Sequence, residues 1–135
     1  HELVVTSDTL NEGTHFWPGE APEFIAHKAL RVNLSDLAAM GAEPLCYQLN
    51  IAYPQNFFSS SSRRKPGSGN LVQEKQQDPV FQRDDRMGEE WVQAFTNALA
   101  ADQKEFSIFC SGGDTTSING PLSISITALG LVPTG

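Results

Sequence analysis

Asn33-Leu34-Ser35-Asp36-Leu37-Ala38-Ala39-Met40-Gly41 is the stretch of this 135-residue chain that indicates most about its fold. It is mostly apolar and ends in glycine, which is typical of the C-terminal end of a packed helix. Pro22 suits the first helical position and Glu23 suits the positive helix start. The sequence therefore predicts a helix from 22 to about 40, and the other predicted elements are arranged around it.

Asp36 is the unusual residue of this helix. At about 100° per residue it falls on the same stripe as Ile25, Ala29 and Val32, so we expect its carboxylate to be buried. No cation lies three or four positions away, so no local ion pair can neutralise it. A buried, unpaired carboxylate is costly unless it changes protonation or meets a cation. We therefore expect Asp36 to lie against a metal ion or a metal-bound ligand.

Alternation and helical spacing predict the remaining elements. The strands are expected at 3–7, 45–53, 106–110 and 122–128, and a second amphipathic helix at 88–102. The first strand barely alternates, so we expect it to be buried on both faces. The order β-α-β-α-β-β indicates an α/β (α+β) fold, with a small mixed sheet, both helices on one face, and the other face left apolar.

Residues 56–83 interrupt this pattern with a polar, low-complexity run. The run lacks the apolar content that a packed core needs, so we interpret it as a disordered surface insertion. A basic arm that binds an anionic partner is the alternative, and the solvated insertion is favoured because such charged runs are usually just exposed.

The net charge of −7 is unevenly distributed. Residues 63–86 hold six of the nine basic residues, and the remainder carries twelve acidic residues against three basic ones. Such a surface excludes nucleic-acid binding through the domain's own field, and a bound polyphosphate would need divalent cations as mediators. No apolar run is long enough for a membrane span. Cys46 and Cys110 lie in apolar runs, and we expect buried, reduced thiols and a cytoplasmic location.

Three acidic residues are predicted to meet at one cleft. Asp8 follows the first strand, Asp36 lies near the end of the first helix, and Asp114 follows the strand at 106–110. Carboxylates from separate elements are how proteins hold Mg²⁺ against substrate phosphates, and three of them suggest more than one ion. For any one aspartate after a strand, a turn or cap role is the alternative.

Two neighbouring motifs add phosphate-binding chemistry. Ser111 to Thr116 is expected to form a glycine turn whose backbone N–H groups approach a phosphate, or else a plain turn between strands. Thr6 and Ser7 supply hydroxyl groups beside Asp8. His15 lies in the following loop, where it is either simply exposed or donates to a substrate phosphate.

These motifs carry a family resemblance. Ser7-Asp8-Thr9-Leu10-Asn11-Glu12-Gly13-Thr14-His15-Phe16 resembles the Thr-Asp-Thr-Leu-Val-Glu-Gly-Val-His-Phe signature of the bacterial thiamine-monophosphate kinases. The stretches 27–44, 112–116 and 120–123 resemble later blocks of that family, so the likeness covers about 1–55 and 86–135. The helix block is shared more loosely by aminoimidazole ribonucleotide synthetase (PurM), selenophosphate synthetase and the hydrogenase maturation protein HypE.

The resemblance implies a PurM N-terminal-like domain and ATP-dependent phosphorylation of thiamine phosphate to thiamine diphosphate. It implies Mg²⁺ ligands at five positions, which are Thr6, Ser7, Asp8, Asp36 and Asp114. It also implies ATP contacts from Gly113 and Asp114, a thiamine phosphate contact from His15, and a homodimer formed by paired sheets.

The family also has an earlier Gly-Asp-Asp block and a second α/β domain that are not among these residues. We therefore expect 1–135 to be a partial N-terminal domain, inactive alone. A related ATP-dependent synthetase or maturation protein, and a module that only dimerises, are the alternatives.

Overall fold

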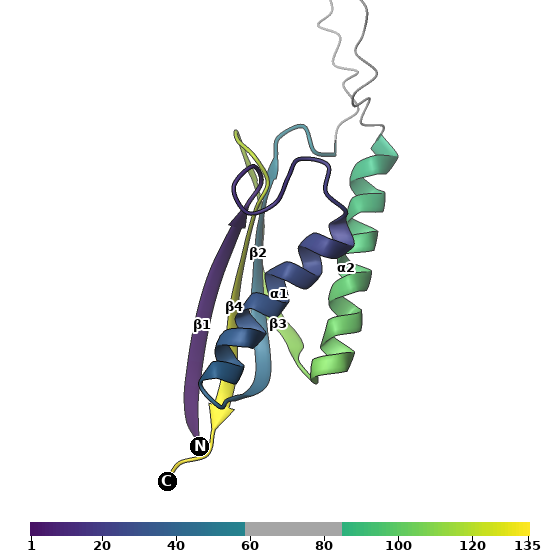
Figure 1. Cartoon of the computed structure of the whole chain (residues 1–135). Coiled ribbons are helices and arrows are strands. Elements are labelled where there is room, and N and C mark those ends of the chain that lie inside the picture. Colours follow the sequence, from purple (N-terminus) through teal and green to yellow (C-terminus); the bar gives the residue numbers. More distant parts are fainter. Residues whose placement is uncertain (59–84) are drawn as a thin grey trace, which may run out of the picture.

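A computed structural model describes residues 1–58 and 85–135 of the chain (Figure 1). Its elements are β1 (Glu2–Asn11), α1 (Pro22–Ala39), β2 (Glu43–Pro54), α2 (Asp85–Phe106), β3 (Phe109–Ile118) and β4 (Ser123–Val132). The predicted order of strands and helices is confirmed. Most elements extend beyond the predicted bounds, because periodicity weakens toward the ends of helices and strands. The strand predicted at 106–110 is wrong at its beginning, since Phe106 ends α2 and β3 begins at Phe109.

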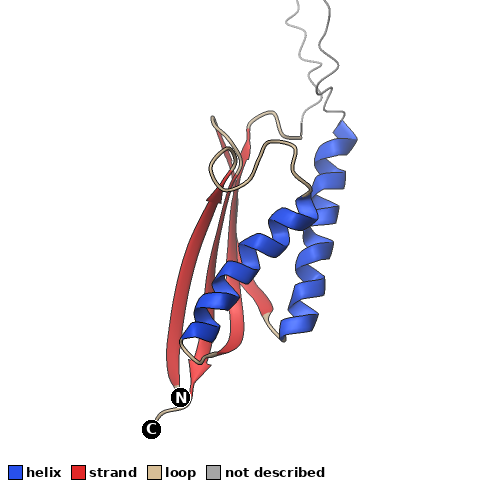
Figure 2. Cartoon of the chain, viewed as in Figure 1, coloured by secondary structure: helices blue, strands red, loops and turns tan. Residues whose placement is uncertain are grey.

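The four strands form one mixed sheet in the order β1-β4-β2-β3. β4 is antiparallel to both β1 and β2, whereas β2 and β3 run parallel and are connected through α2. Both helices cover the same face of this sheet (Figures 1 and 2). The predicted α+β class, with two helices on one face of a small mixed sheet, is confirmed. We call the uncovered side the open face.

The ends of α1 follow from local sequence. Pro22 occupies the first turn with Glu23 beside it, where a missing N–H and a negative charge are both favourable. At the other end Gly41 adopts φ +67° and donates to the Ala38 carbonyl at 2.9 Å, while Ala42 donates to the Leu37 carbonyl at 2.9 Å. This is a Schellman motif, and it turns the chain directly into β2.

The core lies between the helices and the covered face of the sheet. Its largest fully buried side chains include Tyr47, Phe95, Leu30, Leu37, Ile124 and Ile126. Each such side chain stabilises the fold by roughly 1.5–3 kcal/mol relative to an exposed one. The Tyr47 hydroxyl accepts a hydrogen bond from Gln103 Nε2 at 2.8 Å, and burial raises the pKa of Tyr47 to about 12. The phenol therefore stays neutral and joins α2 to the sheet.

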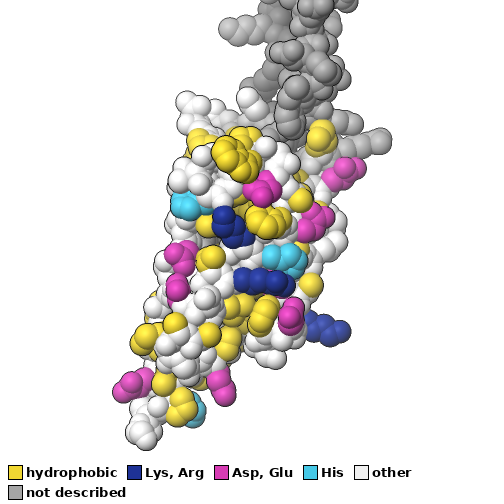
Figure 3. Space-filling model, viewed as in Figure 1, with side chains coloured by type: hydrophobic (Ala, Val, Ile, Leu, Met, Phe, Trp, Pro, Cys, Tyr) yellow, Lys and Arg dark blue, Asp and Glu magenta, His cyan; other side chains and the backbone are white. Residues whose placement is uncertain are grey.

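A charged cluster joins the two helices. Asp102 of α2 is fully buried, and its carboxylate accepts hydrogen bonds from His27 Nδ1 at 2.9 Å and Arg31 Nη2 at 2.8 Å. Burial alone would raise the pKa of Asp102, but the bonds from Arg31 and His27 hold it below the ordinary value. Figure 3 shows basic and histidine side chains in the middle of this helical face, between hydrophobic ones.

The open face differs from the prediction that it would be apolar. Its upper half carries hydroxyl and amide groups, with Ser7 bonded to Thr127 and Thr9 bonded to Ser125. Only the lower half is apolar. Its exposed hydrophobic side chains include Leu3, Val5 and Phe109. The large apolar residues of β2 and β4, such as Tyr47, Ile51 and Ile126, belong to the helix-covered core, and the polar residues that alternate with them are left on the open face.

Two predicted local structures are wrong. β1 is not buried on both faces: it forms an edge of the sheet, with Leu3 and Val5 exposed on the open face. Ser111 to Thr116 is not a turn but the middle of β3, because these residues pair with β2 along its length. Glycines in a strand allow close backbone approach as well as turns, and the sequence did not distinguish the two.

The cysteines are also less buried than predicted. Cys46 is half-buried and Cys110 is exposed, and neither forms a disulfide. Cys46 lies on the open face, whereas Cys110 is in register with the buried Tyr47 and is exposed because β3 is an edge strand of the sheet.

The predicted insertion at 56–83 lies outside the described residues except at its beginning. There, Phe57 is buried and packs against Tyr53 and Trp91, so the ordered chain continues to residue 58. Among the described helices, none has both the length and the apolar character to cross a membrane.

Candidate functional site

A pair of carboxylates lies where α1 crosses the edge strand β1. Thr6 and Asp8 alternate with Ser7 along β1, and Asp8 is opposite Ile126, which is buried beneath the helices. Thr6 and Asp8 therefore face α1. The Thr6 hydroxyl donates to Asp36 Oδ2 of α1 at 3.0 Å, so two elements far apart in sequence meet at one set of oxygen atoms.

The electrostatics of this pair are unfavourable. Burial raises the pKa of Asp8, and the adjacent Asp36 carboxylate raises it further through its charge and a hydrogen bond. No Lys or Arg ion pair involves either carboxylate in the part of the chain that the structure describes. Two adjacent carboxylates and a hydroxyl, without a cation of their own, are donors that suit a hard divalent ion such as Mg²⁺.

The predicted burial of Asp36 is wrong, because its side chain is exposed. The buried stripe of α1 runs through Ala26, Leu30, Asn33 and Leu37, and Asp36 lies at the border of that stripe, on the β1 side. The prediction relied on Ile25, Ala29 and Val32, which lie along the edge of the buried stripe rather than at its centre. The buried polar residue of this helix is instead Asn33, whose Nδ2 donates to the Ala29 carbonyl at 3.0 Å.

Asp114 does not join Asp8 and Asp36 within this chain. It pairs in register with Asn50, which is opposite Ser125, which in turn is opposite Thr9, so all four lie on the open face. Ser7 is also on that face, where its hydroxyl bonds to Thr127. No group of three acidic, histidine or cysteine side chains suited to a metal occurs among the described residues. The predicted convergence of three aspartates is therefore not found in the single chain.

Asp114 borders a shallow polar concavity of about 270 Å³ on the open face. Thr116, Ser123 and Ser125 supply hydroxyls there, and Asp114 Oδ1 accepts the Thr115 N–H at 2.9 Å. The neighbouring Gly113 has φ +146°, and a Cβ at this position would lie 1.7 Å from the Leu49 carbonyl oxygen. Gly113 is thus required for β3 to approach β2, and contact of Gly113 and Asp114 with ATP stays a prediction.

His15 is held in a tight turn after β1. Its Nδ1 accepts the Asn11 backbone N–H at 2.9 Å, and the Thr14 and His15 N–H groups both donate to the Asn11 carbonyl. Phe16 is buried and anchors the end of the turn. Because Nδ1 is an acceptor, the neutral ring carries its proton on Nε2, and that N–H is the group available to a phosphate oxygen.

Lys28 was not predicted as part of the site, yet it fixes this turn. Its ammonium group, from α1, donates to the His15 carbonyl oxygen. Lys28 and His15 also line the same concavity, of about 210 Å³. The available signal was a lysine nearly two turns inside α1, but the sequence did not indicate how the preceding loop folds.

Residues 1–132 match the family model of AIR synthase related protein, N-terminal domain. The chain belongs to this family. Within it, the chain is 35% identical to the thiamine-monophosphate kinase of Haemophilus influenzae over 132 residues, which are 98% of this chain and 30% of that relative. The predicted resemblance is confirmed, and the chain spans about a third of the length of the relatives it matches.

Several solved structures resemble this chain. Thiamine-monophosphate kinase from Stenotrophomonas maltophilia K279a is 37% identical, with a TM-score of 0.71 over 99% of this chain and 32% of that chain. AaThiL complexed with AMPPCP and TMP has a TM-score of 0.67 over 95% of this chain and 31% of that chain, but its 22% identity shows the fold alone. The same holds for the hydrogenase maturation protein HypE, at 14% identity and a TM-score of 0.64 over 99% of this chain and 33% of that chain.

Proposed function

We propose that the chain is the nucleotide- and magnesium-binding N-terminal part of a kinase that transfers the γ-phosphoryl group of ATP to thiamine phosphate. The observation that carries this proposal is the identity of 35–37% to thiamine-monophosphate kinases along nearly the whole chain. The paired carboxylates of Asp8 and Asp36 support it, because phosphoryl transfer depends on positioning and charge neutralisation rather than on a covalent nucleophile.

In this proposal Thr6, Asp8 and Asp36 hold Mg²⁺, which neutralises charge on the transferred phosphoryl group. Asp8 and Asp36 supply the negative oxygens, and the Thr6 hydroxyl keeps Asp36 oriented. His15 donates a hydrogen bond from Nε2–H to the phosphate of thiamine phosphate, with the ring held by the Asn11 backbone N–H. No general base of this chain is needed, because the acceptor phosphate is already ionised at neutral pH.

We also propose that two copies pair through their open faces. Leu3, Val5 and Phe109 leave a contiguous apolar row exposed across this face, and burying such a row is a common driving force for a symmetric dimer. Asp114 and Ser7 lie on the same face, so in a dimer they take part in a surface that the single chain does not complete.

The alternative, a related synthetase or maturation protein, has weaker support. Its fold matches, but the identity to HypE is 14%, whereas thiamine-monophosphate kinases reach 37%. The His15 turn belongs to the block that resembles the kinases specifically.

A chimaera tests the proposed activity. We replace the matching N-terminal third of the Stenotrophomonas maltophilia kinase with residues 1–135 and measure ADP release and thiamine diphosphate formation. We expect stoichiometric production of both with thiamine phosphate as acceptor. A folded chimaera that hydrolyses ATP without forming thiamine diphosphate contradicts the proposal.

A further inference from the structure

Two polar side chains are fully buried in the part of the chain that the structure describes, and they differ in their partners. Asp102 accepts hydrogen bonds on both oxygens, from His27 and Arg31. Asn33 of α1 donates from Nδ2 to the Ala29 carbonyl oxygen at 3.0 Å, but no described group donates to its Oδ1. A buried carbonyl oxygen without a donor destabilises a fold, and internal water is a common donor at such positions.

The contact with Ala29 fixes the orientation of the Asn33 amide. Two carbonyl oxygens cannot hydrogen-bond to each other, so the group that meets the Ala29 carbonyl must be Nδ2. Exchanging the two ends of the amide therefore cannot supply the missing partner, and the unpaired group is the oxygen.

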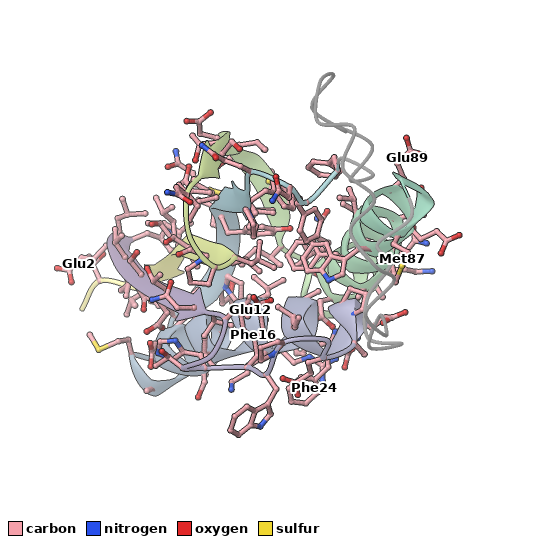
Figure 4. The ribbon with its side chains drawn as sticks, turned by 90° about the horizontal axis from the view of Figure 1, so that it is seen from above. Glu2, Glu12, Phe16, Phe24, Met87 and Glu89 are labelled. Atoms are coloured by element: carbon pink, nitrogen blue, oxygen red, sulfur yellow. The ribbon has the colours of Figure 1, made fainter. Side chains whose placement is uncertain are left out.

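Asn33 lies in the buried stripe of α1, where the helix crosses the covered face of the sheet. Leu37, one turn later, packs against β4, since a Cβ at Gly130 would lie 3.2 Å from Leu37 Cδ2. The neighbouring position on that face of β4 is Ala128, which is also fully buried. Figure 4 shows from above how side chains of the sheet and of both helices fill the space between them. A water molecule is a ligand small enough for so closed a position.

Asn33 is also near the carboxylate pair. It precedes Asp36 by three positions, so the two side chains are neighbours on α1. Asp36 is bonded to Thr6, and Thr6 is opposite Ala128 in the sheet, so these residues surround the point where α1 crosses β1 and β4. The Thr6 hydroxyl donates its proton to Asp36 and still has lone pairs that accept. A water molecule has two protons to donate, and the two sides of this crossing each offer an acceptor.

We propose that Asn33 Oδ1 accepts a hydrogen bond from an internal water that links α1 to the sheet, and that Asn33 thereby positions Asp36. Resting on the proposed function, Asn33 is a positioning residue for the Mg²⁺ site and not a ligand, because its side chain is wholly buried. The stretch that begins at Asn33 then has two polar residues with separate roles. Asp36 supplies the charge, and Asn33 fixes the turn of α1 that carries it.

Asn33→Leu tests whether the oxygen has a donor. Leucine has a similar volume, and replacing an unpaired polar group by an apolar one is neutral or stabilising, whereas replacing a bonded group is destabilising. We expect Asn33→Leu to lower the urea midpoint of the chain, while Asn97→Leu, at an exposed position on α2, does not. An unchanged or higher midpoint in Asn33→Leu overturns the proposal.

The water is observed directly in the parent chain, so this measurement does not depend on a variant that folds. We expect a nuclear Overhauser effect between the Asn33 side-chain amide protons and a long-lived water. Absence of a long-lived water beside this amide overturns the proposal as well.

Asn33→Ala and Asn33→Ser are a matched pair that tests the positioning role. Asn33→Ala should weaken Mg²⁺-dependent binding of a non-hydrolysable ATP analogue about tenfold. Asn33→Ser should recover part of this loss, because its hydroxyl can bond to the same water. Circular dichroism confirms that each variant is folded. A purely structural role would lower the urea midpoint without changing analogue binding by the folded chain, so equal affinities in the parent chain and Asn33→Ala contradict the positioning role.

The chimaera separates this inference from the proposed function. If it forms thiamine diphosphate while Asn33→Leu leaves the urea midpoint of the chain unaltered, the water assignment is wrong and the kinase function stands. If the water is found and Asn33→Leu lowers the midpoint as expected, but the chimaera forms no thiamine diphosphate, the kinase function fails and the water site stands.

Discussion

Asp8 and Asp36 are adjacent carboxylates, and we propose that a site for a cation has been kept here at the expense of the stability of the metal-free chain. The hydroxyl of Thr6 satisfies one oxygen of Asp36, but nothing in the described structure neutralises the second carboxylate beside it. Like charges at short range disfavour the ionised folded state, and a divalent cation reverses that effect. Removing one charge should therefore stabilise the metal-free chain and weaken its response to Mg²⁺.

Asp8→Asn is the direct test of this repulsion. Because the pKa of Asp8 is raised in the folded state, its ionisation disfavours folding at pH values above about 3.8. The substitution should stabilise the metal-free chain at pH 7 by roughly 0.3–1 kcal/mol, a small value because solvent screens the pair. The gain should disappear below pH 3. Urea denaturation at both pH values, without Mg²⁺, measures it, and a loss of stability at pH 7 contradicts the repulsion.

Lys28→Met should loosen the His15 turn. Loss of the ammonium donor leaves the His15 carbonyl unpaired, at a cost of about 1 kcal/mol to the folded turn. Nitrogen NMR of the imidazole should show one Nε2–H tautomer in the parent chain, mixed tautomers in Lys28→Met, and recovery in Lys28→Arg. Lys104→Met, at an exposed position in the last turn of α2, serves as the control. An unchanged tautomer in Lys28→Met rules out the positioning role.

For individual residues, the sequence predicted that Asp8 and Asp36 lie close together but not that Asp36 is exposed. It selected Asp8, Asp36 and His15, and the structure brings the first two together. It placed Asp36 in the core because helical periodicity gives an angle around the axis but not the direction in which the sheet lies. Lys28 was missed because its role depends on the fold of residues 12–21, which have no periodic pattern.

The helices are joined by a contact that periodicity does not predict. Asp102 of α2 is wholly buried and accepts hydrogen bonds from His27 and Arg31 of α1. This carboxylate therefore adds to the hydrophobic packing that positions α1, and with it Asp36. Buried carboxylates of this kind are costly when unpaired and favourable only with complete partners. Periodicity also failed to predict a contact between strands. Gly113 was predicted to make a turn, but it is needed for the close approach of β3 to β2.

Asp102→Asn should destabilise the chain by about 1–3 kcal/mol at pH 7, since it removes a charged acceptor from two partly exposed donors. The pKa of Asp102 is lowered in the folded state, so its contribution is complete above the ordinary value of 3.8 and is lost as the pH falls through the lower folded value. The difference from the parent chain should therefore shrink below pH 4. Chemical denaturation from pH 3 to pH 7 measures it, and Glu105→Gln, whose ion pair with Arg31 is longer and exposed, is the control.

In the whole molecule, one face of the sheet is covered by the helices and the other, the open face, is exposed. The helices, joined by their charged cluster, cover the first face (Figure 3). The open face has a polar half, with hydroxyl groups, and an apolar half, with exposed hydrophobic side chains. Element order and fold class could be predicted because each depends on local periodicity. The division of the open face into a polar and an apolar half could not be predicted. It depends on strand register, which a single sequence specifies only through pairing partners that are distant along the chain.

Val5→Lys tests the role of the apolar row. Val5 is 58% exposed, so a charge there leaves the fold of one chain intact but disfavours burial of the row between two copies. Light scattering after size exclusion should give a dimer for the parent chain and a monomer for Val5→Lys. Thr14→Lys, exposed in the turn and away from this face, should remain a dimer. A parent chain that stays monomeric at high micromolar concentration contradicts the proposed dimer.

The central claim is that Asp8 and Asp36 together hold Mg²⁺ that accompanies a nucleotide. Calorimetric titration of the chain with a non-hydrolysable ATP analogue, with and without Mg²⁺, tests it most directly. We expect Mg²⁺-dependent binding that Asp36→Asn weakens at least about tenfold, since removing one partner of a charged contact costs about 1.5–3 kcal/mol, while Glu43→Gln, an exposed acid at the beginning of β2, leaves it unchanged. Nucleotide binding that is equally tight in Asp36→Asn, or that does not require Mg²⁺, would contradict the claim.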